Sequence, residues 1–336
     1  MDTADRYARF AEFEARGHSP CYEQWCRGIA GDAELLALID ELPRAKRQPN
    51  LVLGAARHLG VEPSEFAEFK RWLLRHWDGV AAVAGSRATQ TNEAGRTAVL
   101  LPLLAALPGP LSLIEIGASA GLCLYPDRFS YRYDGAVSID PDDGASPVVL
   151  PCVTAGNPPL PQRLPTVVHR AGVDVNPLDI NDPEDIRWLE SLVWPEQTHR
   201  LQRLRSVVDI ARTDPPHLSR GNLVDAVPDL VRAAPADTSV VVFGSAVLGY
   251  LDRAARTIFE QRVHALPCHW ISNEAVGVVE SVVGRLPKAV TASRADFVLT
   301  MDGEPVAYAG PHGQSLDWFA GSVREAAYPS RTDGSE

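Results

Sequence analysis

The residues with the clearest chemical potential lie in one short segment, LSLIEIGASAGL, which runs from Leu111 to Leu122. An apolar run ends there in an acid and a turn of small residues, namely Glu115, Gly117, Ala118, Ser119 and Gly121. The two glycines allow a sharp turn and a close approach of the backbone to a ligand. We expect a helix to begin near Ser119, so that its unpaired N–H groups face that ligand. Because a carboxylate at the strand end suits a positively charged amino or sulfonium group better than a phosphate, the segment predicts a binding site for S-adenosylmethionine.

The same letters permit two other interpretations. GASAG also fits GxSxG, the pattern of a serine hydrolase, in which Ser119 would be the nucleophile. Such a hydrolase normally has several strands before this turn, whereas the preceding residues have helical spacing almost throughout and no HGGG motif is present. The dinucleotide pattern GxGxxG is not met, since the two glycines lie four residues apart. The other possibility is a strand and turn with no ligand.

Further candidate ligand-binding residues follow later strands. In an open parallel sheet a ligand lies at the carboxyl ends of the strands, so the residues just after each strand are the ones that reach it. Asp174 in AGVDVNP is placed to accept the two ribose hydroxyl groups, with Asp134 and Asp140 as competitors for this role. Asn222 in SRGN follows the next strand, where its amide would pair with the adenine edge. Each of these four side chains also fits an ordinary loop position.

The segment FGSAVLGY contains candidate residues for the methyl-transfer step. It follows the strand SVVVF and places Gly244, Ser245 and Tyr250 beside the expected position of the reacting methyl group. Methyl transfer is an in-line displacement, in which alignment of donor and acceptor contributes roughly 7 to 11 kcal/mol. If the acceptor carries a proton, a general base adds a factor of about 10² to 10⁴. The candidates for that base are Tyr250, Glu274 and His312, although a structural role is the simpler interpretation for each.

Strands alternate with helices after residue 108, and this order predicts the fold. The first 108 residues show helical spacing of large apolar side chains, which is typical of a helical cap. From 109 to 328 the alternation predicts a Rossmann-like, doubly wound and mostly parallel α/β sheet. Within it, 129–165 combines an alternating strand with many prolines, which indicates an inserted hairpin and loop. Residues 329–336 are expected to form a flexible tail.

Composition and charge restrict the class of protein. The chain of 336 residues is 45% hydrophobic, enough for a large core, and its net charge of −11 argues against wholesale binding to nucleic acid. Its start is charged and amphipathic, prolines interrupt the one long uncharged run, and the five cysteines contain no CxxC pair. The nine histidines show no metal-binding spacing. We therefore expect a cytoplasmic protein with reduced thiols, no membrane span, no metal and a small-molecule substrate; the sequence indicates no oligomeric state.

Five segments carry a resemblance that covers nearly the whole chain. They are TQTNEAGR from Thr89, EIGASAGL from Glu115, AGVDVNPLDI from Ala171, VWPEQ from Val193 and VVVFGSAVLGYL from Val240. Together they resemble the bacterial family of uncharacterised proteins called domain of unknown function 2332. The resemblance implies a class I methyltransferase fold with an N-terminal helical extension, although the family has no assigned activity. It also implies that Asn92 and Glu93 line the donor pocket, unless they only cap the following helix.

The resemblance also assigns positions to the predicted ligand-binding residues. The methyltransferase glycine loop is matched by Glu115, Gly117, Ser119 and Gly121, and its acidic second strand by Asp174. This chain departs from the family at Cys123, where asparagine is common, and at Asn222, where an aspartate is usual. Gly244 replaces a histidine before Ser245, which removes a possible base. The alternative to an active enzyme is therefore a catalytically degenerate, methyltransferase-like binding or regulatory protein.

Overall fold

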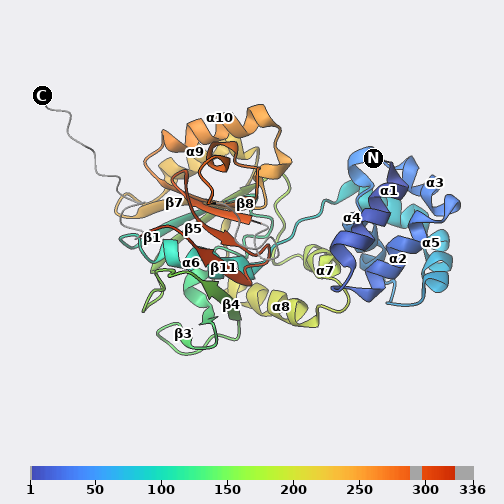
Figure 1. Ribbon diagram of the computed structural model, residues 1–336, viewed down its shortest axis with the longest axis horizontal. Helices are drawn as coiled ribbons and strands as arrows, with labels where there is room; N and C mark the ends of the chain where they lie inside the picture. The colour runs from blue at the N-terminus through green and yellow to red at the C-terminus, as the bar shows by residue number, and fades with distance from the viewer. Residues whose placement is uncertain (1, 288–296, 322–336) are drawn as a thin grey trace, which may run out of the picture. The chain divides into compact units, whose positions relative to one another are not determined.

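The computed structural model describes residues 2–287 and 297–321, and the chain forms two compact units (Figure 1). One unit is helical and comprises Met1–Thr91 with Asp179–Arg205; the other contains the sheet and comprises Asn92–Leu178 with Ser206–Glu336. The described residues hold eleven α-helices and a sheet of 11 strands, so the protein is a mixed α/β protein. The expected tail lies outside the described residues.

Large apolar side chains hold the helical unit together. Trp25 and Phe69 are fully buried, and their rings stack with 4.0 Å between the centroids. Ser19 and Asp32 begin two helices by accepting hydrogen bonds from backbone amides of the first turn. The helices of this unit are α1 (Thr3–Phe10), the π-helix η1 (Ala11–Ala15), α2 (Pro20–Ala30), α3 (Ala33–Glu41), the 3₁₀ helix η2 (Arg44–Lys46), α4 (Pro49–His58), α5 (Phe66–Ser86), α7 (Pro183–Leu192) and the first half of α8 (Thr198–Thr213).

The segment 179–205 is bound to the rest of the helical unit by packing and by hydrogen bonds. Trp188 on α7 is fully buried, and its indole Nε1 donates to the carbonyl oxygen of Ala88 at 3.1 Å. Arg57 on α4 donates to two backbone carbonyl groups of the segment. The helical region expected from the sequence, 1–108, lacks this segment and extends beyond the point where the helical unit ends.

The sheet is mostly parallel. Its strands are β1 (Leu111–Ile116), β2 (Ser130–Tyr133), β3 (Val137–Ile139), β4 (Val149–Ala155), β5 (Val167–Asp174), β6 (His217–Arg220), β7 (Ser239–Ser245), β8 (His269–Ala275), β9 (Phe297–Met301), β10 (Glu304–Ala309) and β11 (Ser315–Trp318). They lie in the order β3-β2-β4-β11-β10-β9-β8-β7-β1-β5-β6. The run β8-β7-β1-β5-β6 is parallel throughout, and the pairs from β8 to β11 are antiparallel. The expected insertion contains the hairpin β2-β3 and also β4, which pairs with β11 and so belongs to the same sheet.

Helices cover the two faces of this sheet (Figure 1). On one face α9 and α10 pack on an apolar core that includes Ile114 of β1 and Val242 of β7. On the other face lies α6, whose residues are all buried. The hydroxyl group of Tyr133 on β2 donates to the Ala98 carbonyl oxygen of α6 at 2.7 Å. The helices of the sheet unit are the 3₁₀ helix η3 (Ala94–Arg96), α6 (Thr97–Leu104), the 3₁₀ helix η4 (Pro126–Arg128), the second half of α8, α9 (Leu223–Ala233), the 3₁₀ helix η5 (Leu248–Tyr250), α10 (Arg253–His264) and α11 (Glu280–Val283).

The helix expected near Ser119 is not present. After β1 the chain forms turns and irregular backbone from 117 to 125, and then the 3₁₀ helix η4 (Pro126–Arg128). Gly117, Ser119 and Gly121 have φ angles of +66°, +51° and +72°. A right-handed helix cannot run through residues in the left-handed region, so this prediction is wrong.

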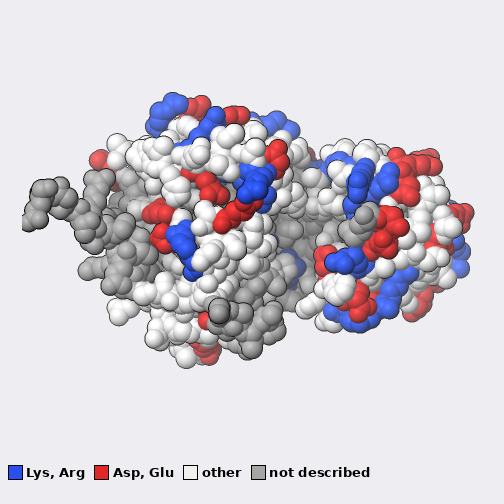
Figure 2. All heavy atoms as spheres, turned by 45° about the horizontal axis from the view of Figure 1, so that its top comes forward, with Lys and Arg blue, Asp and Glu red and all other residues white. Residues whose placement is uncertain are grey.

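Charged side chains of both signs are interspersed on the visible face of the sheet unit (Figure 2). No helix in the described parts of the chain combines the length and the apolarity that a membrane crossing demands. The most apolar helix, α6, has only 8 residues, whereas a span needs roughly 20.

Candidate functional site

Two side chains fix the loop that follows β1. Asn92 bonds to both of its ends: Nδ2 donates to the Ala118 carbonyl oxygen at 3.2 Å, and Oδ1 accepts from the Leu122 amide at 2.9 Å. Asp174, at the end of β5, holds the middle, since its Oδ2 accepts from the Ser119 amide at 2.8 Å. Two pairs of predicted site residues are therefore in contact, Asn92 with Ala118 and Asp174 with Ser119. Because these amides are bonded within the protein, the loop is not the open cradle of N–H groups that the sequence suggested.

The space beside Gly117 is taken by the side chain of Val247. A Cβ added at Gly117 would lie 2.3 Å from a methyl carbon of Val247. The same side chain lies beside Gly244 at the end of β7, where an added Cβ would approach it to 2.9 Å. Gly121 is packed against another loop, with an added Cβ 2.8 Å from Pro216. Val247 therefore covers the point where β1 and β7 end side by side.

Glu115 lies in a buried position near the end of β1. The residue is only 6% exposed, and its Oε2 has no hydrogen-bond partner among the described residues. Burial raises the pKa of the Glu115 carboxyl to about 8; hydrogen bonds from Cys123 and the charge of Arg96 oppose this, and the charge of Asp174 adds to it. The carboxyl group is therefore mostly protonated at neutral pH unless a cation approaches Oε2.

Arg96 is a candidate residue that sequence reasoning missed. It is 7% exposed, its Nη1 donates to the Ser245 carbonyl oxygen at 3.1 Å, and its Nε donates to that of Pro311 at 2.9 Å. A buried cation is thus held between the end of β7 and the loop that joins β10 to β11. Its charge lowers the pKa of both Glu115 and Glu274. The signal in the sequence was an arginine directly before the apolar run TAVLLPLL, because a charge there must enter the core.

Strands β7 and β8 end in polar side chains that touch each other. Nδ2 of Asn273 donates to Oγ of Ser245 at 2.9 Å, while Oδ1 of the fully buried Asn273 has no partner in the described chain. The next residue, Glu274, accepts from the amides of Val247 and Leu248 with Oε1, at 2.9 and 3.0 Å. Burial raises the pKa of Glu274, and these amide bonds lower it. Glu274 therefore holds the turn that carries Val247.

Two predicted residues are helix caps. Oε1 of Glu93 accepts from the Gly95 amide at 3.0 Å, which closes the turn before η3. Oδ1 of Asn222 accepts from the Val224 amide at 2.8 Å at the start of α9. Both side chains therefore have a local structural role, whatever else they contact.

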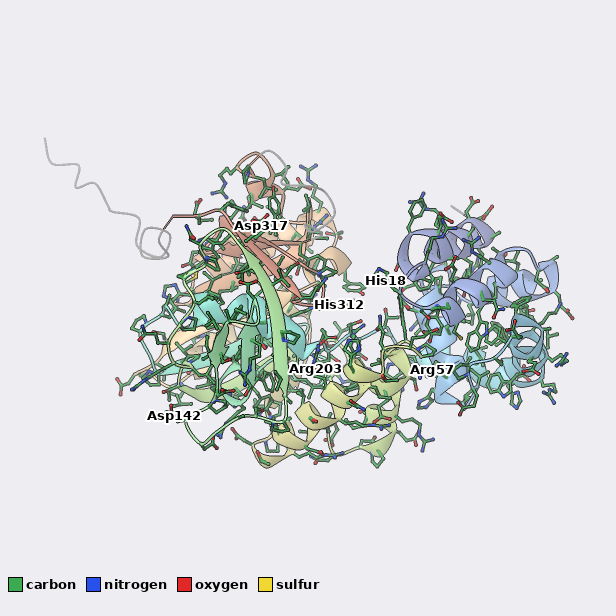
Figure 3. All side chains as sticks on the ribbon, turned by 60° about the horizontal axis from the view of Figure 1, so that its bottom comes forward. His18, Arg57, Asp142, Arg203, His312 and Asp317 are labelled. Atoms are coloured by element: carbon green, nitrogen blue, oxygen red, sulfur yellow. The ribbon has the colours of Figure 1, made fainter. Side chains whose placement is uncertain are left out.

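The predicted bases differ in exposure, since Glu274 is buried and Tyr250 is exposed. Tyr250 is 73% exposed. His312 lies on the loop between β10 and β11 (Figure 3), next to the residue that Arg96 binds. The alternative ribose-binding residues are occupied in the insertion, where Asp134 accepts from the Thr154 amide at 2.6 Å and Asp140 pairs with Arg132. Of the three acids considered for the ribose, Asp174 is the one at the end of a strand that pairs with β1.

Thiols and metal ligands add no further cluster to this site. All five cysteines are free, and burial raises the pKa of Cys123, beside Glu115, well above its usual value. Within 2–287 and 297–321, no three His, Cys, Asp or Glu side chains are grouped as metal ligands would be.

The fold and the site define a mixed α/β protein whose polar side chains gather at the carboxyl ends of parallel strands. Residues 4–318 match the family model described as "Uncharacterized protein conserved in bacteria (DUF2332)". The chain therefore belongs to this bacterial family. A search of curated proteins gave no match.

Proposed function

We propose that the chain is an S-adenosylmethionine-dependent methyltransferase that acts on a small molecule. The observation that supports this most is Glu115, a buried carboxyl group with a free oxygen near the end of the central strand. The strands β6-β5-β1-β7-β8 follow the order 3-2-1-4-5 of doubly wound folds. That order reverses between β1 and β7, and ligands of such folds bind at the reversal.

The residues at the strand ends fit a nucleoside with a positively charged tail. Oε2 of Glu115 has no hydrogen-bond donor among the described residues. An amino or sulfonium group of the ligand would place a positive charge beside this oxygen. The oxygens of Asp174 accept from the amides of Ser119 and Asn176, and each keeps a lone pair for a ribose hydroxyl group. Asn222 follows β6, where its amide NH₂ remains for the adenine edge while its oxygen caps α9.

Binding at this point requires Val247 to move away from Gly117. The two loops concerned are strained, since Ser119 and Ala246 are two of the four non-glycine residues with a left-handed φ in the described chain. Left-handed backbone at such residues costs roughly 1 to 2 kcal/mol and is common at functional sites. We infer that the turn after β7 changes conformation when the ligand enters.

S-adenosylmethionine, when bound, supplies an activated methyl group. The role of the protein is then to hold the acceptor and to exclude water. Arg96 and the amide nitrogen of Asn273 both bond to Ser245, and the two side chains would orient an acceptor there. Glu274 positions the turn after β7 rather than acting as a base, because its Oε1 already accepts two amide bonds. Methyl transfer by alignment needs no further side chain.

A second candidate is a methyltransferase-like protein that binds a nucleoside without turnover. The position of Val247 over Gly117 favours this second candidate, because the Val247 side chain covers the expected ligand site in this structure. The serine hydrolase hypothesis gains no such support. Ser119 is 3% exposed and its Oγ has no hydrogen-bond partner among the described residues, whereas a nucleophilic serine needs a base within reach.

Two measurements on the same preparation test the proposal. We expect saturable binding of S-adenosylhomocysteine in a calorimetric titration, and transfer of labelled methyl groups from S-adenosylmethionine to a member of a metabolite library. Glu115→Gln should weaken the binding by about tenfold, whereas Glu41→Gln, at an exposed position, should not. Binding without any transfer would select the second candidate, and absence of binding at millimolar concentration would reject both.

A further inference from the structure

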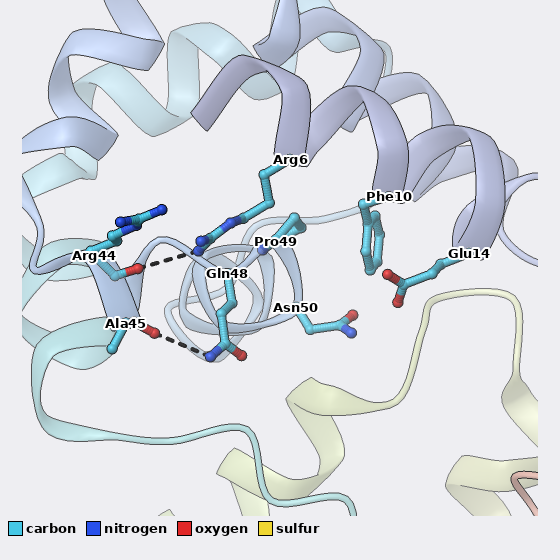
Figure 4. A pocket seen from close by; sticks show the side chains of 8 residues that line it. All are labelled: Arg6, Phe10, Glu14, Arg44, Ala45, Gln48, Pro49 and Asn50. Carbon is cyan, nitrogen blue, oxygen red and sulfur yellow. Dashed lines mark hydrogen bonds between the residues drawn. The ribbon is translucent and has the colours of Figure 1, made fainter. Parts of the chain in front are cut away.

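The helical unit contains an open pocket of about 660 Å³ that the proposed function does not use (Figure 4). It lies between α1, η1, η2 and the beginning of α4. The lining includes Arg6, Phe10, Glu14, Arg44 and Asn50. The volume is within the range of about 300 to 1,000 Å³ that is typical of small-molecule sites.

One side of the pocket is positively charged. Figure 4 shows the side chains of Arg6 and Arg44 together on this side. Nη1 of Arg6 donates to the Arg44 carbonyl oxygen at 3.2 Å, which fixes the Arg6 side chain and leaves its other N–H groups for a ligand. The guanidinium group of Arg44 forms no hydrogen bond or ion pair with the described residues. Two guanidinium groups with spare donors suit a carboxylate.

The other side of the pocket carries a negative charge beside an aromatic ring. Glu14 and Phe10 lie next to each other there (Figure 4). Glu14 belongs to η1, a π-helical turn closed by a bond from the Arg16 amide to the Ala11 carbonyl oxygen at 3.0 Å. Such turns are rare and frequent at functional sites. No described cation pairs with Glu14, and although the residue is exposed overall, nearby protein atoms desolvate its carboxyl group and raise its pKa.

A third group, Asn50, presents a hydrogen-bond donor. Its Oδ1 accepts from the indole Nε1 of Trp194 at 2.9 Å, which fixes the orientation of the amide. Its Nδ2 has no partner in the described parts of the chain. The Trp194 ring also packs edge-on against Phe10, with 5.7 Å between centroids, so the wall between the two charged sides is held in place.

We propose that this pocket binds a small amino acid whose ammonium and carboxylate groups are separated by an apolar chain. The carboxylate of the ligand lies at Arg6 and Arg44, its ammonium group at Glu14, and its apolar part against Phe10. A ligand with only one charge would engage one side and leave the opposite side in contact with water alone, so it would bind more weakly than a zwitterion. This inference does not depend on the proposed methyl transfer, because it rests only on residues of the helical unit.

Calorimetric titration of the full chain with a series of ω-amino acids of increasing chain length tests the inference. We expect at least one of them to bind saturably, and Arg44→Gln and Glu14→Gln each to weaken that binding by about tenfold. Arg9→Gln and Glu41→Gln change exposed charges of the same unit outside the pocket and should leave the affinity unchanged. All four substitutions are at exposed positions, so the variants should fold.

Analogues of the bound amino acid distinguish a site for a zwitterion from a site that binds a single charged group. The amine that lacks the carboxylate and the acid that lacks the amino group should each bind at least about tenfold more weakly. Equal affinity for either analogue overturns the inference. So does a failure of every amino acid to bind at millimolar concentration, or an affinity that neither pocket substitution changes.

Discussion

At the level of single residues, the proposed ligand site depends on a carboxyl group in an environment that disfavours its charge. Glu115 is buried near the end of β1, with Arg96 as the nearby cation and Asp174 as a second acid. Burial outweighs the attraction of Arg96, so the pKa is raised to about 8 rather than lowered. A carboxyl group with this pKa would give up its proton near neutral pH if a positively charged ligand group approached it, which a carboxylate on the surface would not do.

Glu115→Gln should flatten the pH dependence of stability. Because burial raises the pKa of Glu115 from 4.5 to about 8, the bound proton stabilises the folded state fully below pH 4.5, and this stabilisation is lost as the pH rises through 8. The free energy of unfolding of the unmodified protein should thus fall over that interval by an amount on the order of a few kcal/mol. Urea denaturation at both ends of the interval measures it. Equal slopes for the protein and the variant would show that the carboxyl group is not perturbed.

At the scale of elements, the turn after β1 is held by its neighbours and not by its own sequence. Asn92 bonds to the backbone at Ala118 and Leu122, and Asp174 bonds to Ser119. These contacts come from residues distant in sequence, and they keep the turn in a left-handed backbone conformation.

Replacement of Asn92 should therefore loosen the turn. Asn92→Ala removes two hydrogen bonds and leaves two backbone groups without them, which should lower the free energy of unfolding by about 2 kcal/mol. Asn92→Asp keeps the acceptor for the Leu122 amide and should cost less. Chemical denaturation of the three proteins checks this order. A loss that is equal for both variants would mean that the bond to Leu122 contributes nothing.

Two glycines distinguish crowding from backbone strain. Gly117 and Gly135 have nearly the same φ, +66° and +67°, but an added Cβ would meet Val247 at 2.3 Å in the first case and no atom within 4 Å in the second. Gly135→Ala should therefore cost about 1 kcal/mol from the left-handed backbone alone. Gly117→Ala should cost about 1 to 3 kcal/mol more because of the overlap. Thermal unfolding of both variants measures the difference, and equal losses would mean that Val247 yields freely.

The features of the fold and site that could be predicted are those whose interacting residues lie close together in the sequence. The strand SVVVF was evident from its apolar run, and the structure has β7 there. The helix expected at Ser119 was wrong, because left-handed φ angles in that turn are stabilised by tertiary contacts that spacing does not reveal. Arg96 and Asn273 were missed for the same reason: their partners lie on other elements.

At the scale of the whole molecule, the chain crosses between its two units more than once. The helical unit is completed by Asp179–Arg205, which follows β5 of the sheet unit. Trp188 of that segment is fully buried, so the first 91 residues alone would expose the surface that it covers. A boundary drawn at a single point in the sequence could not describe this arrangement.

A fragment experiment follows from this organisation. We expect residues 1–91 alone to unfold without a sharp transition, and the addition of a peptide of residues 179–205 to restore cooperative unfolding, because the peptide covers the apolar surface that Trp188 contacts. The peptide with Trp188→Ala is the matched control and should restore less. Circular dichroism against temperature is the measurement. Identical curves with and without the peptide would show that the first 91 residues are complete on their own.

If a nucleoside places its ammonium group beside Glu115, its binding should displace the proton of that carboxyl group, and calorimetry in buffers of different ionisation enthalpy measures this displacement. Titration with S-adenosylhomocysteine near pH 7 should be saturable and should release close to one proton, since the ligand's ammonium group lowers the pKa of Glu115 from about 8. In Glu115→Gln the proton release should disappear and the affinity should fall. Absence of binding at millimolar concentration, or binding whose heat does not depend on the buffer, would contradict the proposed binding of the nucleoside at Glu115.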